Sequence, residues 1–242
     1  MLKIENVEVA GWEAAIRGMR NPKNSWAKSD SHWDYVNQGP EYLTVAHFDD
    51  ADFNIGPNDK KLMSTLRNAG TDHRKFMRMI TVYLDITAPL YWWKEFDTYK
   101  VGTVANSCST MHKIAAKEFT LEDFSCEHLC DDELELLKEI IARLNMNRIV
   151  FIAKDDKRVD RYSVMTDECY AKYKKKLWWQ MIQLLPSSYN QKRTVMLNYE
   201  VLANIYKSRR HHKLDEWHTL CDWIESLPYS ELITGKEEKA DV

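Results

Sequence analysis

An arginine near the end of the chain, Arg209, is placed to bind an anion. A helix from about Thr194 to Arg210 would put it on one stripe with three other residues, Asn198, Leu202 and Ile205. An arginine on an inward-facing stripe needs a partner, and its planar guanidinium suits a carboxylate, a phosphate or the edge of a pyrimidine ring. The pattern leaves two alternatives open: a buried acidic residue of the chain itself, or a bound nucleotide.

A second group of reactive and hydrogen-bonding side chains lies between Gly102 and Thr110. Hydroxyl, amide and thiol groups follow one another there, on Thr103, Asn106, Ser107, Cys108 and Ser109. Such a segment offers many donors at low bulk, so it is either a ligand-binding loop or an ordinary polar turn. Cys108 would act as a nucleophile only beside a base, and the sequence identifies none.

Two further clusters favour structural roles. Cys126, His128 and Cys130 are metal-ligating types, but a structural zinc site needs four ligands and no second pair lies nearby, so we expect no metal. Lysines crowd residues 172–176 beside Trp178 and Trp179. Because the whole chain carries a formal charge of -3, this is better interpreted as a solvated helix face than as a nucleic-acid site.

The composition excludes several classes of protein. The chain has 242 residues, 44% hydrophobic and 29% charged, which is enough to bury a large core. Its seven glycines form neither G-x-G-x-x-G nor a Walker loop, which argues against Rossmann and P-loop chemistry. No segment approaches the ~20 apolar residues of a membrane span. The five cysteines form no regular framework, so we expect reduced thiols in a cytoplasm.

The hydrophobic periodicity predicts a single α+β domain over residues 1–242. It has a small mixed or antiparallel sheet and a helical C-terminal half. The expected strands are Leu2–Val9, Tyr42–Phe48 and Met79–Thr87, and residues 21–40 form a long loop. A helix begins after Gly56, capped by Asn58 or Asp59, and ends near Asn68, while Pro89 opens a short aromatic helix. Further helices are expected from Asp131, at 165–186, at 194–210 and at 214–227, followed by a frayed tail.

Several short motifs occur in a consistent order between about residues 58 and 227. They are Lys61-Leu62-Met63, Gly70, the strand before Ala88-Pro89, Thr98-Tyr99-Lys100, Leu185-Pro186 and the segment from Asn198 to Arg209. In this order they resemble the flavin-dependent thymidylate synthases. The resemblance implies the fold of that family, FAD as cofactor, and methylation of dUMP at C5 with a methylene group from folate. It also implies a homotetramer whose sites lie between subunits.

The resemblance also assigns roles to individual residues. It implies that Asn198, Asn204 and, after a one-residue shift, Asn106 bind the cofactor. Nucleotide binding falls to Arg209, Lys100, Thr103 and Ser109, with Arg209 also the catalytic candidate. Three parts of the family pattern differ here. Glu200 stands where the family has an arginine, and Met77-Arg78 stands where it has a Glu-His pair. The stretch from Thr98 stands where the family has its R-H-R signature, and it retains one basic residue, Lys100.

Two functional hypotheses therefore remain. One is a cytoplasmic FAD-dependent thymidylate synthase-like enzyme that binds dUMP or a related pyrimidine nucleotide. The other is a catalytically inactive protein that sequesters or senses a nucleotide on the same fold. Neither hypothesis involves a membrane or a nucleic acid.

Overall fold

A computed structural model describes residues 2–35, 51–153 and 166–236. The chain forms two compact units, each assembled from separate segments. Unit 1 contains Met1–Glu5, Asp85–Thr98 and Ala105–Val195. Unit 2 contains Asn6–Leu84, Tyr99–Val104 and Met196–Val242. No helix among the described residues is long and apolar enough to cross a membrane.

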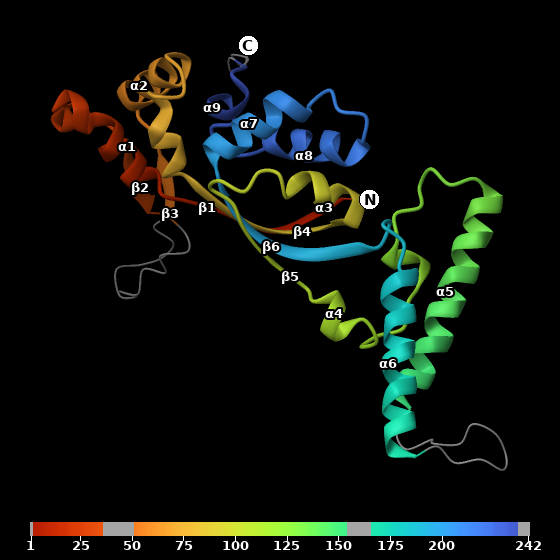
Figure 1. The fold of residues 1–242 in the computed structure, drawn as a ribbon. Coiled ribbons are helices and arrows are strands. Elements are labelled where there is room, and N and C mark those ends of the chain that lie inside the picture. The colour runs from red at the N-terminus through yellow and green to blue at the C-terminus, as the bar shows by residue number, and fades with distance from the viewer. Residues whose placement is uncertain (1, 36–50, 154–165, 237–242) are drawn as a thin grey trace, which may run out of the picture. The chain divides into compact units, whose positions relative to one another are not determined.

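A four-stranded sheet has the order β1-β4-β6-β5 (Figure 1). Its strands are β1 (Lys3–Ala10), β4 (Thr81–Pro89), β5 (Val104–Ser107) and β6 (Asn190–Asn198). In β4 the buried side chains alternate at Val82, Leu84 and Ile86, which is the pattern of a strand with one face in a core. The strands predicted at Leu2–Val9 and Met79–Thr87 are therefore confirmed. The strand predicted at Tyr42–Phe48 lies outside the described residues.

Unit 1 is built around a helical hairpin. It contains α3 (Leu90–Phe96), the short α4 (Thr110–Lys113), α5 (Asp131–Ile152) and α6 (Asp167–Leu184), and α5 packs along α6. Leu137, Ile141 and Leu144 of α5 meet Met181 of α6 in a core that also holds Phe119. The helices predicted from Asp131 and at 165–186 are confirmed.

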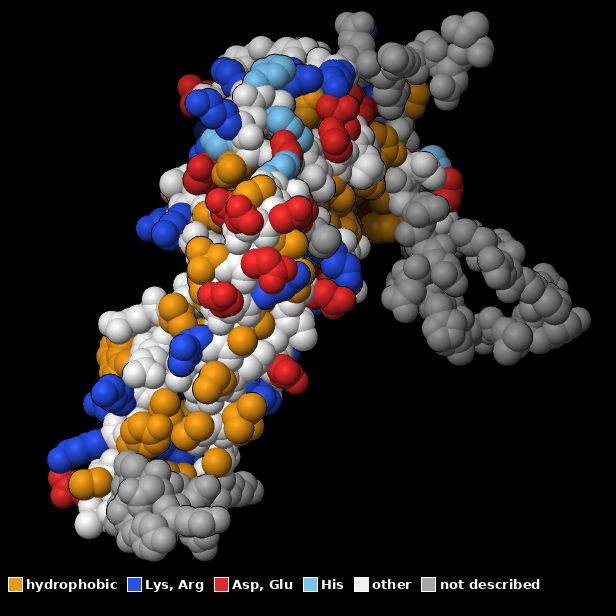
Figure 2. Space-filling model, turned by 90° about the vertical axis from the view of Figure 1, so that its right-hand side faces the viewer, with side chains coloured by type: hydrophobic (Ala, Val, Ile, Leu, Met, Phe, Trp, Pro, Cys, Tyr) orange, Lys and Arg blue, Asp and Glu red, His pale blue; other side chains and the backbone are white. Residues whose placement is uncertain are grey.

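The outer faces of α5 and α6 carry exposed apolar side chains. On α5 these are Leu136, Met146, Ile149, Val150 and Ile152, and on α6 they are Tyr173, Trp179 and Leu184. Figure 2 shows hydrophobic side chains over this part of unit 1. Exposed apolar patches of this kind often mark contacts between proteins.

Unit 2 contains the other α-helices of the described residues. They are α1 (Trp12–Arg20), α2 (Pro57–Asn68), α7 (Tyr199–Arg209), α8 (Asp215–Glu225) and α9 (Glu231–Thr234). A two-stranded antiparallel ribbon pairs β2 (His32–Tyr35) with β3 (Ala51–Asn54). Within the described residues of this unit, three 3-10 turns occur, at Asn21–Lys23, Trp26–Lys28 and Arg74–Arg78. Fully buried Trp217 and Tyr199 lie in its core.

Three local predictions were wrong. The helix predicted over 194–210 is strand β6 as far as Asn198 and helix α7 only from Tyr199, because Val195 and Leu197 alternate into a core as strand residues do. The predicted loop at 21–40 contains two 3-10 turns and strand β2 within its described part. The N-cap of α2 is Gly56, and the Asp30 carboxylate accepts the backbone N–H groups of Asn58 and Asp59, while the Asp59 carboxylate binds Arg20.

Candidate functional site

The cofactor and substrate candidates lie in both units, and each group is built locally. In unit 2 the segment Tyr99–Val104 packs on α7. Arg209 donates from Nε to the Tyr99 hydroxyl at 2.9 Å, and its guanidinium carbon lies 4.7 Å from the centre of the Trp217 ring. An aromatic ring attracts a cation through its quadrupole. The Tyr99 hydroxyl and the Trp217 ring therefore help to hold Arg209. The Glu200 carboxylate is bound by a different arginine, Arg78.

Asn198 ends β6 and caps α7. Its side-chain oxygen accepts the Val201 backbone N–H at 3.0 Å, which satisfies one of the unpaired donors at the start of the helix. Gly102 approaches this amide closely, with a φ of +80°. A Cβ at Gly102 would lie 2.8 Å from Asn198 Nδ2, so the approach requires glycine. Asn198 thus has a structural function in the fold itself.

Thr103 and Lys100, from the same segment, are placed differently. The Thr103 hydroxyl is buried and has no hydrogen-bond partner among the described residues. Buried hydroxyls are nearly always paired, so this one is available to a ligand. Lys100 is exposed.

Glu200 is the centre of an ion-pair cluster in unit 2. The carboxylate is buried and accepts hydrogen bonds from Arg78 and, at 3.4 Å, from Arg74 Nε. Arg74 also donates to the side-chain oxygen of Asn204 at 3.1 Å. Burial raises the pKa of Glu200, but the hydrogen bonds and charges of Arg78 and Arg74 outweigh it and lower the pKa below its usual value. Glu200 is therefore ionised and paired.

In unit 1, a cavity of about 350 Å³ lies beside the segment that joins β5 to α4. We call it the β5–α4 cavity. Cys108, Ser109 and Thr110 line it together with Lys113. Its other charged lining groups are Lys117, Lys192, Glu122 and Asp123. Its volume lies at the lower end of the range for small-molecule sites.

The lysines of this cavity differ in how far their charge is compensated. Lys117 forms an ion pair with Asp123, and Lys192 forms one with Asp85 at 3.0 Å. Lys113 is exposed and forms no ion pair with any residue in the described ranges. Lys113 is thus the cation here that has most to gain from an anionic ligand.

Aromatic and amide groups complete the wall. Phe119 and Tyr189 meet edge to face with ring centres 6.2 Å apart. Burial raises the pKa of Tyr189, so its phenol stays protonated at neutral pH. Gln191 donates from Nε2 to the carbonyl of Cys108 at 2.9 Å, which ties β6 to the lining segment. The cavity wall is therefore anchored to the sheet.

The structure brings only some of the candidate residues together. Ser109 lines the β5–α4 cavity, where its Oγ accepts the His112 backbone N–H at 3.1 Å, while Asn106 is exposed on β5. Arg209, Asn198 and Thr103 belong to unit 2. Sequence reasoning missed Lys113, Tyr189 and Gln191, because no strand was predicted at the start of β6 and nothing in the sequence placed residues 189–191 beside Ser109. In the described part of the chain, no three His, Cys, Asp or Glu side chains are grouped to hold a metal ion.

Known proteins similar to this chain are found by structure and not by sequence. No protein-family model and no curated protein sequence matches the chain. Thymidylate synthase X (ThyX) from Helicobacter pylori, in two crystal structures with FAD and dUMP, superposes with TM-scores of 0.58 and 0.60 at 14% and 15% identity. The alignments cover 97% and 96% of this chain and 98% of ThyX.

The chain has the ThyX fold. A UMP/dUMP methylase, PolB from Streptomyces cacaoi bound with 5-Br dUMP, also matches, with a TM-score of 0.50 and 10% identity over 93% of this chain and 89% of PolB. The resemblance seen in the sequence is thus confirmed at the level of the fold. At such identities the ThyX fold alone is shared, so function has to be argued from the side chains.

Proposed function

We propose that the protein binds a pyrimidine nucleoside monophosphate, dUMP or a close relative, in the β5–α4 cavity of unit 1. The observation that carries this proposal is the set of groups on one wall: the hydroxyls of Ser109 and Thr110 beside the uncompensated charge of Lys113. Hydroxyl donors with a lysine are a common way to bind a phosphate. The dUMP bound to ThyX and the 5-Br dUMP bound to PolB support this ligand class.

The rest of the cavity suits a small planar base. Phe119 and Tyr189 offer apolar ring surface, and the Asn190 and Gln191 amides offer both donors and acceptors. A pyrimidine carries carbonyl acceptors and a ring N–H on one edge, so paired amides can read it. A cavity of about 350 Å³ suits a mononucleotide better than a larger ligand.

Two of the three asparagines that the resemblance assigns to FAD already use their side-chain oxygens within the chain. Asn198 caps α7, and Asn204 accepts from Arg74. Glu200, at the position of the family's arginine, is an anion already bound by Arg78 and Arg74. Exchanging a guanidinium for a carboxylate removes an attractive contact to a diphosphate. We therefore infer nucleotide binding without flavin chemistry, as a protein that sequesters or senses the nucleotide.

The FAD-dependent methylating enzyme is the second candidate, favoured by one observation. The buried Thr103 hydroxyl without a partner lies in the segment that packs on α7, where a ligand would satisfy it. The absorption spectrum of the purified protein incubated with FAD separates the two candidates. We expect no retained flavin absorption, and a stably yellow protein would favour the enzyme.

We also propose a cytoplasmic homotetramer. All five cysteines are free thiols, which fits a reducing compartment. The exposed apolar faces of α5 and α6 favour self-association. The resemblance implies four copies.

Calorimetric titration with dUMP tests the nucleotide proposal. Lys113→Ala should weaken dUMP binding about 10-fold or more, because a hydrogen bond to a charged group is worth about 1.5 to 3 kcal/mol. Uridine, which lacks the phosphate, should bind weakly and respond little to the substitution. Lys172→Ala, on the exposed face of α6, is the matched control and should bind like the wild type. Equal dUMP affinity of wild type and Lys113→Ala would reject the site.

A further inference from the structure

A second cavity, outside the proposed nucleotide site, is strongly basic. It lies in unit 2 between the 3-10 turns and α2, with a volume of about 620 Å³, and we call it the Arg20 cavity. Four cationic side chains line it, from Arg20, Lys23, Lys28 and Lys61. Its other lining residues, Ser25, Asn58, Leu62 and Thr65, are uncharged, so no carboxylate from the described ranges lines it.

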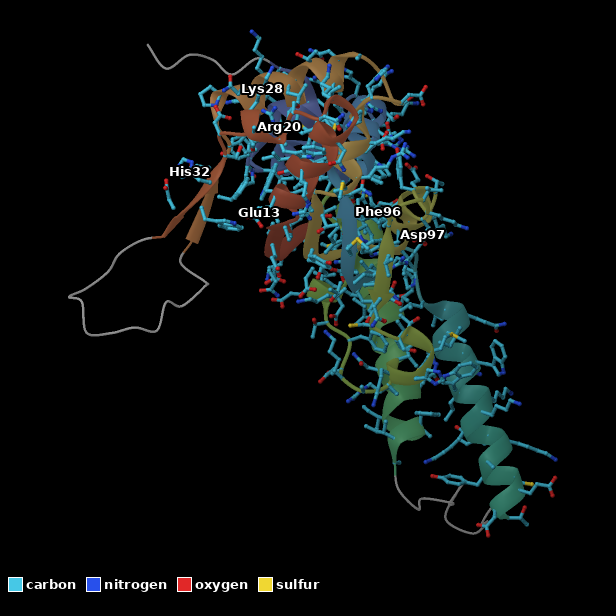
Figure 3. The ribbon with its side chains drawn as sticks, turned by 90° about the vertical axis from the view of Figure 1, so that its left-hand side faces the viewer. Glu13, Arg20, Lys28, His32, Phe96 and Asp97 are labelled. Carbon is cyan, nitrogen blue, oxygen red and sulfur yellow. The ribbon has the colours of Figure 1, made fainter. Side chains whose placement is uncertain are left out.

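One of the four cations, Arg20, is already paired within the protein. Arg20 donates from Nε to Asp59 Oδ1 at 2.6 Å, and the two side chains are 4% and 0% exposed. The same guanidinium donates to the carbonyls of Ser25, at 3.1 Å, and Lys28, at 3.0 Å. Arg20 and Lys28 accordingly lie side by side in Figure 3. Arg20 therefore fixes the backbone at Ser25 and Lys28, two residues that line the cavity.

Asp59 fixes the next stretch of the same segment onto α2. Its Oδ2 accepts from the Ser29 and Ser31 hydroxyls, both at 2.7 Å. Asp30 in turn accepts the backbone N–H groups of Asn58, at 2.9 Å, and Asp59, at 3.1 Å. The turns and the start of α2 are thus one hydrogen-bonded assembly, so the cavity wall is ordered before any ligand arrives.

Three lysines remain without a compensating anion. Arg20 and Asp59 neutralise each other, whereas Lys23, Lys28 and Lys61 are exposed and form no ion pair within the described part of the chain. Three like charges around one cavity repel one another, and a multiply charged anion relieves that repulsion. A nucleoside monophosphate carries about two negative charges, too few for three lysines, whereas a triphosphate carries three to four.

We propose that the Arg20 cavity binds a small oligophosphate, either inorganic triphosphate or the triphosphate group of a nucleotide. Lysine acts on phosphate as a point charge from a flexible stem, so three of them can surround a chain of phosphates without fixed geometry. The cavity is large enough for such a ligand. The site is separate in its residues from the β5–α4 cavity.

Calorimetric titrations of the full chain with sodium triphosphate and with ATP, near 0.15 M salt, test the proposal. Each single substitution, Lys23→Ala, Lys28→Ala or Lys61→Ala, should weaken binding several-fold, and the triple variant should weaken it at least 100-fold. All three lysines are exposed, so the variants should fold. The triple variant should also keep the wild-type affinity for dUMP, which separates this site from the proposed nucleotide cavity.

Controls and probes decide between the sources of the ligand. A triple variant on α6, Lys172→Ala with Lys175→Ala and Lys176→Ala, changes the net charge equally and should bind triphosphate like the wild type. Tighter binding of ATP than of triphosphate would assign a nucleotide, and equal binding would assign the phosphates alone. Binding unchanged in the first triple variant, no binding at millimolar triphosphate, or affinity that rises with the length of an oligonucleotide would overturn the proposal.

Discussion

At the scale of single residues, Arg209 shows how aromatic side chains help to hold a half-buried cation. Its partners include the Tyr99 hydroxyl and the Trp217 ring, both in unit 2. The sequence predicted that a partner was needed, but periodicity along one helix contains no information about Tyr99, 110 residues away. The nucleotide-binding and catalytic roles that the resemblance implies for Arg209 stay predictions.

Substitution of Arg209 separates a structural role from a ligand-binding one. Arg209→Ala should lose at least about 1 to 2 kcal/mol of stability, because it removes the hydrogen bond to Tyr99 and the contacts with the Tyr99 and Trp217 rings. The dUMP affinity should stay within two-fold, because Arg209 does not line the β5–α4 cavity. Thermal melts with and without dUMP measure both. An unchanged melting temperature with a ten-fold weaker dUMP affinity would assign Arg209 to the nucleotide.

A substitution of Glu200 tests how much its ion pairs with Arg74 and Arg78 stabilise the fold. Glu200→Gln should cost about 1 to 3 kcal/mol at pH 7, because Arg74 and Arg78 lose their carboxylate partner. The fold lowers the pKa of Glu200, so its contribution is present above the ordinary value of 4.5 and is lost as the pH falls through the lower folded pKa. The stability gap between variant and wild type should therefore shrink towards pH 3.

Urea unfolding at pH 7 and pH 3 measures this gap. Glu168→Gln, in an exposed pair with Lys172, is the control and should unfold like the wild type at both pH values. A gap that stays constant across this range would show that the charge of Glu200 does not stabilise the fold.

At the scale of elements, a buried ion pair between Arg20 at the end of α1 and Asp59 in α2 connects these two helices. Burial raises the pKa of Asp59, but hydrogen bonds from Ser29, Ser31, Arg20 and the Asp30 N–H outweigh it, so the pKa is lowered. Residues 39 apart in the sequence form this pair. The sequence showed only a helix start, where an acidic residue near the first turn is ordinarily a cap.

Asp59→Asn should therefore destabilise the protein by about 3 to 5 kcal/mol at pH 7, as expected when one member of a buried ion pair is removed. The wild-type advantage is present above the ordinary pKa of 3.8 and is lost as the pH falls through the lower folded value. Chemical denaturation between pH 7 and pH 2.5 checks this. Asp97→Asn, whose carboxylate is half-exposed beside Arg193, is the control. A loss as small as that of Asp97→Asn would contradict the interpretation.

The boundary between β6 and α7 shows why some elements were predicted and others were not. Long amphipathic helices such as Asp131–Ile152 have apolar residues that repeat with the period of a helix, so they were predicted correctly. Between Thr194 and Arg210 no Gly or Pro marks the change from strand to helix, and the spacing of Asn198, Leu202 and Ile205 fits a helix throughout. Asn198 itself is the signal, because it is the N-cap of α7.

Only part of the candidate site could be predicted from the sequence. Ser109 was found because its segment gathers hydroxyls, whereas Lys113 and Tyr189 become neighbours only when β6 is placed beside β5. Contacts between distant segments do not follow from local periodicity. Arg78 and Glu200 both depart from the family pattern, and only the structure shows that these two residues form an ion pair with each other.

At the scale of the whole molecule, the exposed apolar residues of α5 and α6 predict self-association. Light scattering on the purified protein should give the mass of a homotetramer at micromolar concentration. Met146→Glu combined with Ile149→Glu, both on the exposed face of α5, should yield smaller species because charge is disfavoured in an apolar interface. Lys138→Glu, a polar position on the same helix, should leave the mass unchanged. A monomeric wild type would contradict the prediction.

The crystal structure of the complex with dUMP tests the proposed nucleotide binding most directly. We predict that the phosphate lies within hydrogen-bond distance of Ser109 Oγ and Lys113 Nζ, with the pyrimidine against Phe119 and Tyr189 in the β5–α4 cavity. Nucleotide bound against Arg209 and α7 instead, or an empty β5–α4 cavity in crystals grown with saturating dUMP, would contradict it.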